Sequence, residues 1–453
     1  MTRYLVIALL LASSVAAQTP DVAFVKGQVI KRVVTRANPE QSYALYLPEA
    51  YDPAKQWPIV FAFDPGARGW VPVDLAKDAA ETFGYIVVGS NNSRNGPPGP
   101  EAEAADAMWN DAHERFSIDP RRVYFAGFSG GSRLAVQLAV NCKHCATGVI
   151  ASGAAFPTTM EPKPPAQFLY FGSYGREDFN YSEYVDIEAK LKRAGYAYHL
   201  RRFEGGHEWA PADVWSEALA WFNLQAMKSG ALARNEAFVA EQLSAAMTNA
   251  AAQSDDLDRL RAYSQSVRDF AGLADVGAAQ KLAGALDGSK SVQQLLRREQ
   301  QDIREQQTLT APIEEQLEAL KNPDRRSDAR VELDRAFTRV NENARSKDPH
   351  RQAVAKRARQ QAFIEMFETA SDQIADKHYA EALILMDVVV QAAAHAPGAH
   401  IQKSRIYMLM DKESKALAEA RLAVKDGVTD PEAFSDPEFA PLRSDPAFKA
   451  LFP

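Results

Sequence analysis

Cysteine is nearly absent from this sequence of 453 residues, which has only Cys142 and Cys145. A scaffold held together by several disulfides is therefore excluded. The pair stands in Cys-Lys-His-Cys, and no fourth ligand is near enough in the sequence to complete a metal site with His144. It also follows a predicted helix, whereas a thioredoxin-like site places its first Cys at a helix N-terminus, where the thiolate is stabilised. We expect a structural disulfide; free thiols, and redox or metal chemistry, stay open as alternatives.

An excess of basic residues is also lacking. Lys and Arg number 52 against 59 Asp and Glu, which gives a formal net charge of −7. This balance argues against nucleic acid or an anionic membrane as the main partner. Hydrophobic residues make up 46% and charged residues 25%, as in ordinary soluble globular proteins. The length predicts two or three domains.

Long apolar runs are missing beyond the N-terminus. Arg3 is followed by an apolar stretch at 4–12, and residues 15–17 read Val-Ala-Ala, with small residues where a signal peptidase cuts. The apolar run is well short of the ~20 residues needed to span a bilayer. We expect residues 1–17 to be a cleavable signal peptide and the mature protein to be periplasmic or secreted, without a membrane span. An uncleaved membrane anchor is the alternative.

Short apolar runs alternate with helical patterns over residues 18–228. The runs lie at 58–63, 85–89, 122–126, 147–151, 167–171 and 198–203. Helical spacing is found at 73–83, 101–116, 130–141, 182–195 and 212–228. Near-continuous apolar runs are typical of strands buried on both faces, so this alternation predicts an α/β fold with a mostly parallel sheet between helices. Two earlier runs, at 22–35 and 41–47, are expected to form an antiparallel edge.

Strand signals disappear after about residue 229. Residues 229–362 therefore predict an all-helical region. Its helices are expected to break near residues 274–277 and at Gly288, Pro312, Pro323 and Pro349, because Pro and Gly interrupt helices.

A weak internal repeat marks residues 363–453. Ala382 and Ala416 stand 34 residues apart, which is the tetratricopeptide period. Ala370 and Ser404 fall at matching positions, and small residues are needed wherever paired helices approach closely. The segment resembles tetratricopeptide-like helical repeats, and an unrelated helical bundle stays open.

The clearest chemical signal is Gly127-Phe128-Ser129-Gly130-Gly131, which follows a predicted strand and opens a predicted helix. This is the G-x-S-x-G nucleophile elbow in its expected context. The glycines permit backbone angles and close approaches that a Cβ would forbid. The pattern predicts Ser129 as a nucleophile, while a glycine-rich turn without chemistry is the plain alternative.

A serine hydroxyl needs a base, and the base needs an orienting carboxylate. In this fold the chain order is Ser, then the acid, then His. His207 comes directly after the last predicted strand and follows two glycines, so we expect it to be the base. Asp178, after the preceding strand, is the expected acid, with Glu177 as its competitor.

These segments carry a resemblance to a known family. The matching stretches are 123–132, 172–181 and 205–209. Residues 18–228 resemble the α/β-hydrolase superfamily and, within it, the secreted esterases related to polyhydroxybutyrate depolymerases and feruloyl esterases. The resemblance implies an α/β-hydrolase domain that cleaves esters through Ser129, His207 and Asp178.

An oxyanion intermediate needs N–H donors. We expect Gly130 to provide one, and Gly66 or Ala67 to provide the second. Here the chain departs from the family, because Asp64-Pro65 stands where His-Gly is expected and Pro65 has no N–H.

A second loop leaves the same edge of the predicted sheet. It spans residues 90–96, and its polar residues Asn91, Asn92 and Arg94 are candidate substrate-binding residues. An ordinary turn-rich loop is an equal alternative.

The sequence as a whole predicts an exported carboxylic-ester hydrolase that needs neither a metal nor an organic cofactor. Its substrate would be a small-molecule or polymer-linked ester. A serine peptidase of the prolyl-oligopeptidase type is one alternative. The other is a catalytically inactive scaffold that binds a protein partner through its helical repeats.

Overall fold

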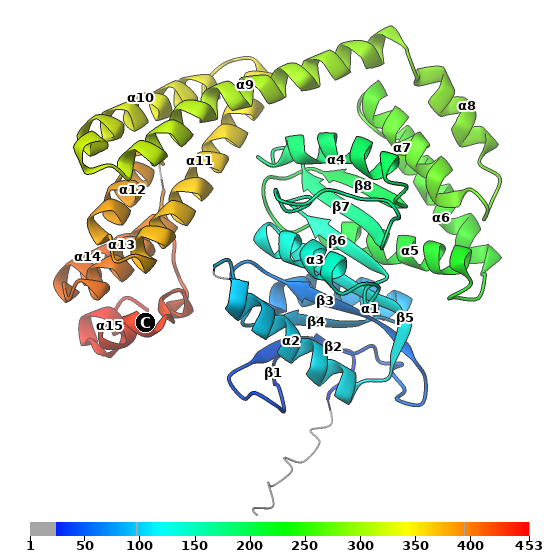
Figure 1. The fold of residues 1–453 in the computed structure, drawn as a ribbon, viewed down its shortest axis with the longest axis horizontal. Coiled ribbons are helices and arrows are strands. Elements are labelled where there is room, and N and C mark those ends of the chain that lie inside the picture. Colours follow the sequence, from blue (N-terminus) through cyan, green and yellow to red (C-terminus); the bar gives the residue numbers. More distant parts are fainter. Residues whose placement is uncertain (1–23, 97, 394, 453) are drawn as a thin grey trace, which may run out of the picture.

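The computed structural model describes residues 24–96, 98–393 and 395–452. The expected signal peptide at residues 1–17 lies outside this part of the chain. The N-terminal half forms an α/β domain, and the C-terminal half is helical (Figure 1).

The sheet has eight strands in the order β1-β2-β4-β3-β5-β6-β7-β8. β2 is antiparallel to both of its neighbours, while the pairs from β4 to β8 are all parallel, so the expected antiparallel edge is present. The strands are β1 (Val29–Val34), β2 (Ser42–Tyr46), β3 (Trp57–Phe63), β4 (Ile86–Ser90), β5 (Ile118–Phe128), β6 (Gly148–Ser152), β7 (Leu169–Gly175) and β8 (Tyr198–Phe203).

Helices cover both faces of the sheet. They are α1 (Trp70–Phe83), α2 (Pro98–Arg115), α3 (Gly130–Asn141), α4 (Tyr181–Arg193) and α5 (Ala212–Ser229). Apolar residues of α1 and α5 pack into one core, and those of α2, α3 and α4 pack into the core on the opposite face. β3, β4 and β6 are almost entirely buried, which explains why their sequences read as unbroken apolar runs. The result is a three-layer α/β domain, in agreement with the predicted fold class.

The remaining described chain is helical. Its helices are α6 (Glu236–Ala251), α7 (Asp256–Phe270), α8 (Gly277–Leu286), α9 (Lys290–Leu320), η1 (Pro323–Arg325), α10 (Arg326–Ala344), α11 (Pro349–Ala375), α12 (Tyr379–Ala392), α13 (Pro397–Leu409), α14 (Glu413–Lys425), η2 (Pro431–Phe434), η3 (Pro437–Phe439), α15 (Ala440–Ser444) and α16 (Pro446–Lys449). None of the helices in the described ranges has the length and apolar content needed to cross a bilayer. Figure 1 shows α9 leading away from α8 toward α10 and α11 on the other side of the molecule.

One expected helix break is wrong. Pro312 lies inside α9, a helix of 31 residues that continues on both sides of the proline. Leu309, Ile313 and Leu317 on either side are buried in the core of the helical half. Their tertiary packing therefore outweighs the hydrogen bond lost at the proline.

The C-terminal helices follow one another as hairpins. The small residues Ala370, Ala382, Ser404 and Ala416 are all buried, and the Ser404 hydroxyl donates to the Ala416 carbonyl at 2.8 Å. The residues chosen for close helix packing therefore lie inside the helical core. The expected boundary between residues 362 and 363 falls within α11, so this helix spans the end of the 229–362 segment and the start of the 363–453 segment.

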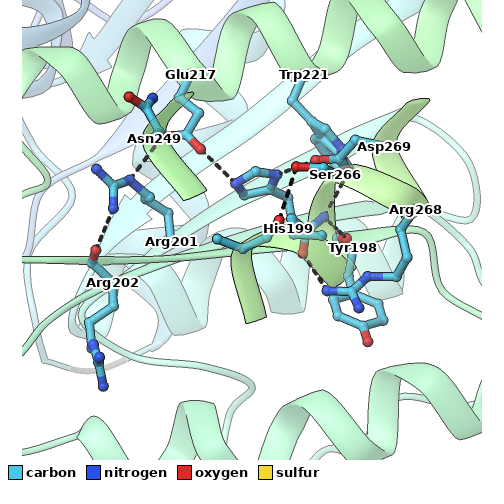
Figure 2. A network of polar contacts seen from close by, with 12 residues as sticks. Tyr198, His199, Arg201, Arg202, Glu217, Trp221, Asn249, Ser266, Arg268 and Asp269 are labelled. Carbon is cyan, nitrogen blue, oxygen red and sulfur yellow. Dashed lines mark hydrogen bonds and ion pairs between the residues drawn. The ribbon is translucent and has the colours of Figure 1, made fainter. Parts of the chain in front are cut away.

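A buried ionic network ties α7 to the sheet (Figure 2). His199 of β8 contacts Asp269 of α7 through Nδ1 and Glu217 of α5 through Nε2, both at 2.9 Å. The Trp221 indole donates to Asp269 at 2.7 Å, and Arg201 pairs with Glu217. Burial opposes protonation of the ring, but the carboxylates of Asp269 and Glu217 outweigh it and raise the pKa of His199 to about 9. The junction is therefore held by an imidazolium between two carboxylates.

This raised pKa predicts a pH-dependent stability. The folded protein binds the His199 proton more tightly than the unfolded chain, whose imidazole has its ordinary pKa of 6.5. The contribution is complete below pH 6.5 and is lost as the pH rises to about 9, and it amounts to about 3 kcal/mol. We expect the free energy of unfolding to fall across this window in the native chain but not in His199→Gln, as measured by urea titration. Equal pH slopes in the two proteins would contradict the network.

Candidate active site

Ser129 occupies a sharp turn between the end of β5 and the start of α3. Its backbone has φ 54° and ψ −121°, a conformation that costs free energy for a residue with a side chain. The Ser129 N–H donates to the Ser152 carbonyl at 2.9 Å, which ties the turn to the neighbouring strand. A Cβ on Gly127 would lie 2.0 Å from the Gly131 carbonyl oxygen, so no larger residue fits there. The glycine spacing thus permits the turn that exposes the hydroxyl.

His207 lies in the loop that follows β8. Its Nε2 is 2.9 Å from the Ser129 hydroxyl. The ring lies between two phenyl rings, with centroid distances of 4.7 Å to Phe128 and 4.3 Å to Phe179. Only 4% of the side chain is exposed. The imidazole is therefore fixed in orientation and well placed to accept the hydroxyl proton.

Asp178 lies after β7 and is fully buried. Its Oδ1 is 2.9 Å from His207 Nδ1 and accepts a second bond from the Asn180 N–H at 2.8 Å. Its Oδ2 has no hydrogen-bond partner among the described residues. Burial raises the pKa of Asp178, although the His207 contact counteracts the rise. The competitor Glu177 points elsewhere and pairs with Lys356 at 2.7 Å.

The expected oxyanion donors are placed differently from one another. Gly130 begins α3, so its N–H has no partner within the helix. The Gly66 N–H, in contrast, donates to the Asp64 carboxylate at 2.8 Å, and the Ala67 N–H donates to the Asp64 carbonyl at 3.1 Å. Both expected donors, the N–H groups of Gly66 and Ala67, are therefore engaged with Asp64 in this structure.

The three candidate substrate-binding residues of the 90–96 loop have structural partners. The Asn91 amide donates to the Lys31 carbonyl at 3.0 Å, and Asn92 accepts from the Ser42 N–H at 2.9 Å. Arg94 forms an ion pair with Asp436 of the C-terminal segment at 3.8 Å. None of the three lines the cavity at Ser129.

The helical half forms a roof over Ser129. A cavity of about 710 Å³ has its floor on the α/β domain and its roof on α9 and α11. Its floor includes Ser129, Gly130 and Arg133, and its roof includes Gln307 and Glu365. Ser129 therefore opens into a chamber that is lined by both halves of the chain.

Hydrogen bonds attach this roof to the loop that carries Asp178. Gln306 of α9 donates to the Phe179 carbonyl at 2.9 Å, and Arg357 of α11 donates to the Gln306 side chain at 2.8 Å. Arg357 is buried, and burial lowers its pKa. Neither Gln306 nor Arg357 is predictable from the sequence, because no local pattern links residues so far apart in the chain.

The two cysteines do not line the cavity at Ser129. Cys142 and Cys145 form a disulfide just after α3. Within the described ranges, no group of three or more His, Cys, Asp or Glu side chains is arranged to hold a metal ion.

No known protein-family model matches the chain, and no curated protein does. Solved structures do resemble part of it. An S-formylglutathione hydrolase from Staphylococcus aureus is 13% identical, with a TM-score of 0.35, over 44% of this chain and 96% of its own. An esterase from Pyrobaculum calidifontis is 14% identical, with a TM-score of 0.37, over 45% and 87%. A feruloyl esterase module from Clostridium thermocellum is 16% identical, with a TM-score of 0.34, over 42% and 87%.

These similarities are too distant to carry a functional conclusion. The described chain itself shows an α/β-hydrolase-like domain followed by an all-helical region.

Replacing Asp178 by Asn tests the role of the carboxylate. An amide cannot stabilise a protonated His207, so we expect turnover of an ester to fall by about 10⁴-fold. The folded protein already disfavours the charge on Asp178, as its raised pKa indicates, so Asp178→Asn should not lower the melting temperature. Steady-state kinetics and differential scanning calorimetry measure the two effects.

Glu177→Gln is the matched control, since Glu177 is half-exposed and its ion pair among the described residues is with Lys356. Its turnover should stay within about threefold of the native value, because exposed ion pairs contribute little. Loss of activity in Glu177→Gln together with a fully active Asp178→Asn would reverse the assignment.

Proposed function

We propose that this chain is an exported serine hydrolase that cleaves carboxylic esters. The observation that supports this best is the unbroken line of 2.9 Å contacts from the Ser129 hydroxyl through His207 to Asp178. A nucleophile, a base and an orienting carboxylate arranged in this way are the parts that acyl transfer requires.

The first half of the reaction uses all three groups. Ser129 Oγ attacks the carbonyl carbon of the ester while its proton passes to His207 Nε2. Asp178 holds the Nδ1–H and stabilises the imidazolium that forms. The Gly130 N–H, at the positive end of α3, faces the developing oxyanion. His207 then donates its proton to the departing alkoxide, which leaves as an alcohol, and the acyl group stays on Ser129.

The second half repeats these steps with water. His207 takes a proton from the water that attacks the acyl carbon, and the second tetrahedral intermediate collapses to release the carboxylic acid. The proton returns to Ser129.

The chamber favours a polar ester. Its roof presents mainly amides and carboxylates, including Gln307, Gln361, Glu314 and Glu365. Burial raises the pKa of Glu365, and the charges of Glu314 and Glu368 add to the rise. A long alkyl chain would leave these groups without water or partners, which is costly. Hydroxylated acyl groups or alcohols fit this lining better than fatty acyl chains.

Export is supported by the charge and apolar pattern of residues 1–17 and by a disulfide that suits an oxidising compartment. We expect the protein recovered from the periplasm or medium to begin at Gln18. Mass spectrometry of its N-terminal peptide measures this, and an intact Met1 in the exported fraction would contradict cleavage.

Ser129→Ala tests the nucleophile. We expect hydrolysis of short p-nitrophenyl esters to fall by about 10⁴-fold or more, since the remaining site retains only binding and oxyanion stabilisation. Ser244→Ala is the control, because Ser244 lies exposed on α6, away from the chamber. Initial rates of ester hydrolysis, measured by absorbance, compare each variant with the native protein. A Ser129→Ala variant that stays active would contradict the proposal.

A further inference from the structure

The proposed reaction leaves the second donor to the oxyanion unassigned. A tetrahedral oxyanion in an acyl-transfer site is held by preorganised N–H donors, and Gly130 provides one. The 64–69 loop provides no second donor among the groups expected there. Pro65 has no N–H, and the N–H groups of Gly66 and Ala67 are bound to Asp64.

Asp64 is held firmly in this arrangement. The side chain is fully buried, and its Oδ2 accepts from the Trp209 indole at 2.8 Å. The Arg68 guanidinium also contacts the carboxylate, with 3.0 Å from Nε to Oδ1. Releasing the Gly66 N–H would leave a buried carboxylate short of a donor, which is unfavourable. The N–H groups of Gly66 and Ala67 therefore stabilise Asp64 and do not face an oxyanion.

A different amide lies beside Gly130. The side chain of Asn95 is packed against it so closely that a Cβ on Gly130 would lie 1.9 Å from Oδ1 and 2.8 Å from Nδ2. Asn95 is exposed, and among the described residues its side chain has no hydrogen-bond partner. Half a turn about its Cβ–Cγ bond exchanges the oxygen and the nitrogen, and no bond opposes that turn.

The backbone holds Asn95 at this position. Its N–H donates to the Pro65 carbonyl at 2.9 Å, and the adjacent Arg94 pairs with Gly66 in an isolated β-bridge. The 90–96 loop is thus joined to the 64–69 loop, next to the N-terminus of α3. An exposed amide without a partner among the described residues is thus placed against Gly130, the residue that follows the nucleophile.

We propose that the Asn95 side-chain amide is the second oxyanion donor of this hydrolase. The inference rests on the proposed function, since it assigns a role within the same acyl-transfer reaction. Asn95 Nδ2 donates to the oxygen as the carbonyl becomes tetrahedral, together with the Gly130 N–H. No proton is transferred and no bond to Asn95 is formed, so the residue acts on the charge alone.

Two substitutions separate this role from simple packing. Asn95→Ala removes the donor, and we expect kcat for a p-nitrophenyl ester to fall about 100- to 1,000-fold while KM changes little, because the contact forms only in the transition state. Asn95→Asp keeps the size of the side chain but replaces the donor with a negative charge. We expect it to be at least as impaired as Asn95→Ala.

A transition-state analogue gives an independent measurement. A trifluoromethyl ketone adds to a serine hydroxyl to form a tetrahedral oxyanion. Its inhibition constant should rise in Asn95→Ala by about the same factor by which kcat/KM falls. Melting temperatures of both variants should match the native protein, since the side chain forms no hydrogen bond that folding depends on.

The outcomes are distinct. If the native protein hydrolyses esters in a Ser129-dependent manner but Asn95→Ala keeps kcat within about threefold, the Asn95 inference is overturned and the proposed function stands. An Asn95→Asp that is clearly more active than Asn95→Ala shows a packing role and also overturns it. If the native protein hydrolyses no ester and is not inhibited by the ketone, the proposed function fails, and the Asn95 inference fails with it.

Discussion

The burial of the Asp178 carboxylate against His207 is the constraint on which the site depends. A fully buried carboxylate is unfavourable, and its raised pKa shows that the neighbouring imidazole and one backbone N–H offset this only in part. The arrangement is kept because β7, β8 and β5 end at the same edge of the sheet, where their loops bring Asp178, His207 and Ser129 together. The two phenyl rings beside His207 then exclude water and leave the imidazole little freedom to turn.

The helical half contacts this site directly. Gln306 donates a hydrogen bond to the loop between Asp178 and α4, and Arg357 donates one to Gln306. Residues of α9 and α11 line the chamber at Ser129. Ile303 of α9 packs against the core of the α/β domain, and the network at His199 anchors α7 beneath. The surface pair of Lys356 and Glu177 adds little to this attachment, since both side chains are about half-exposed. In the proposed reaction, a substrate bound in this chamber would contact both halves of the chain.

Much of the α/β domain could be predicted from local patterns, because buried strands and covering helices have distinct apolar periods. Ser129, His207 and Asp178 were chosen from the elbow motif, the order of the segments and the glycines before His207, and the structure brings the three within hydrogen-bonding distance. No local sequence pattern predicts the roof of the chamber, since the hydrogen bond from Gln306 to Phe179 joins residues separated by 127 positions.

The remaining differences have local physical causes. Pro312 stays inside α9 because flanking apolar residues are buried. In the 90–96 loop, amide-rich composition pointed to Asn91 and Asn92, whereas pairing with β1 and β2 consumes their side chains and leaves Asn95 beside Gly130. Which amide of a polar loop is unpartnered depends on tertiary contacts and cannot be read from composition.

The central claim is that Ser129 is an activated nucleophile in the folded chain. Covalent labelling with a fluorophosphonate, followed by peptide mass spectrometry, tests it most directly, because such reagents phosphonylate only serines that a base has activated. We predict one adduct per chain, located on Ser129 and abolished by prior unfolding. A folded protein that carries no adduct, or carries it on another residue, would contradict the account.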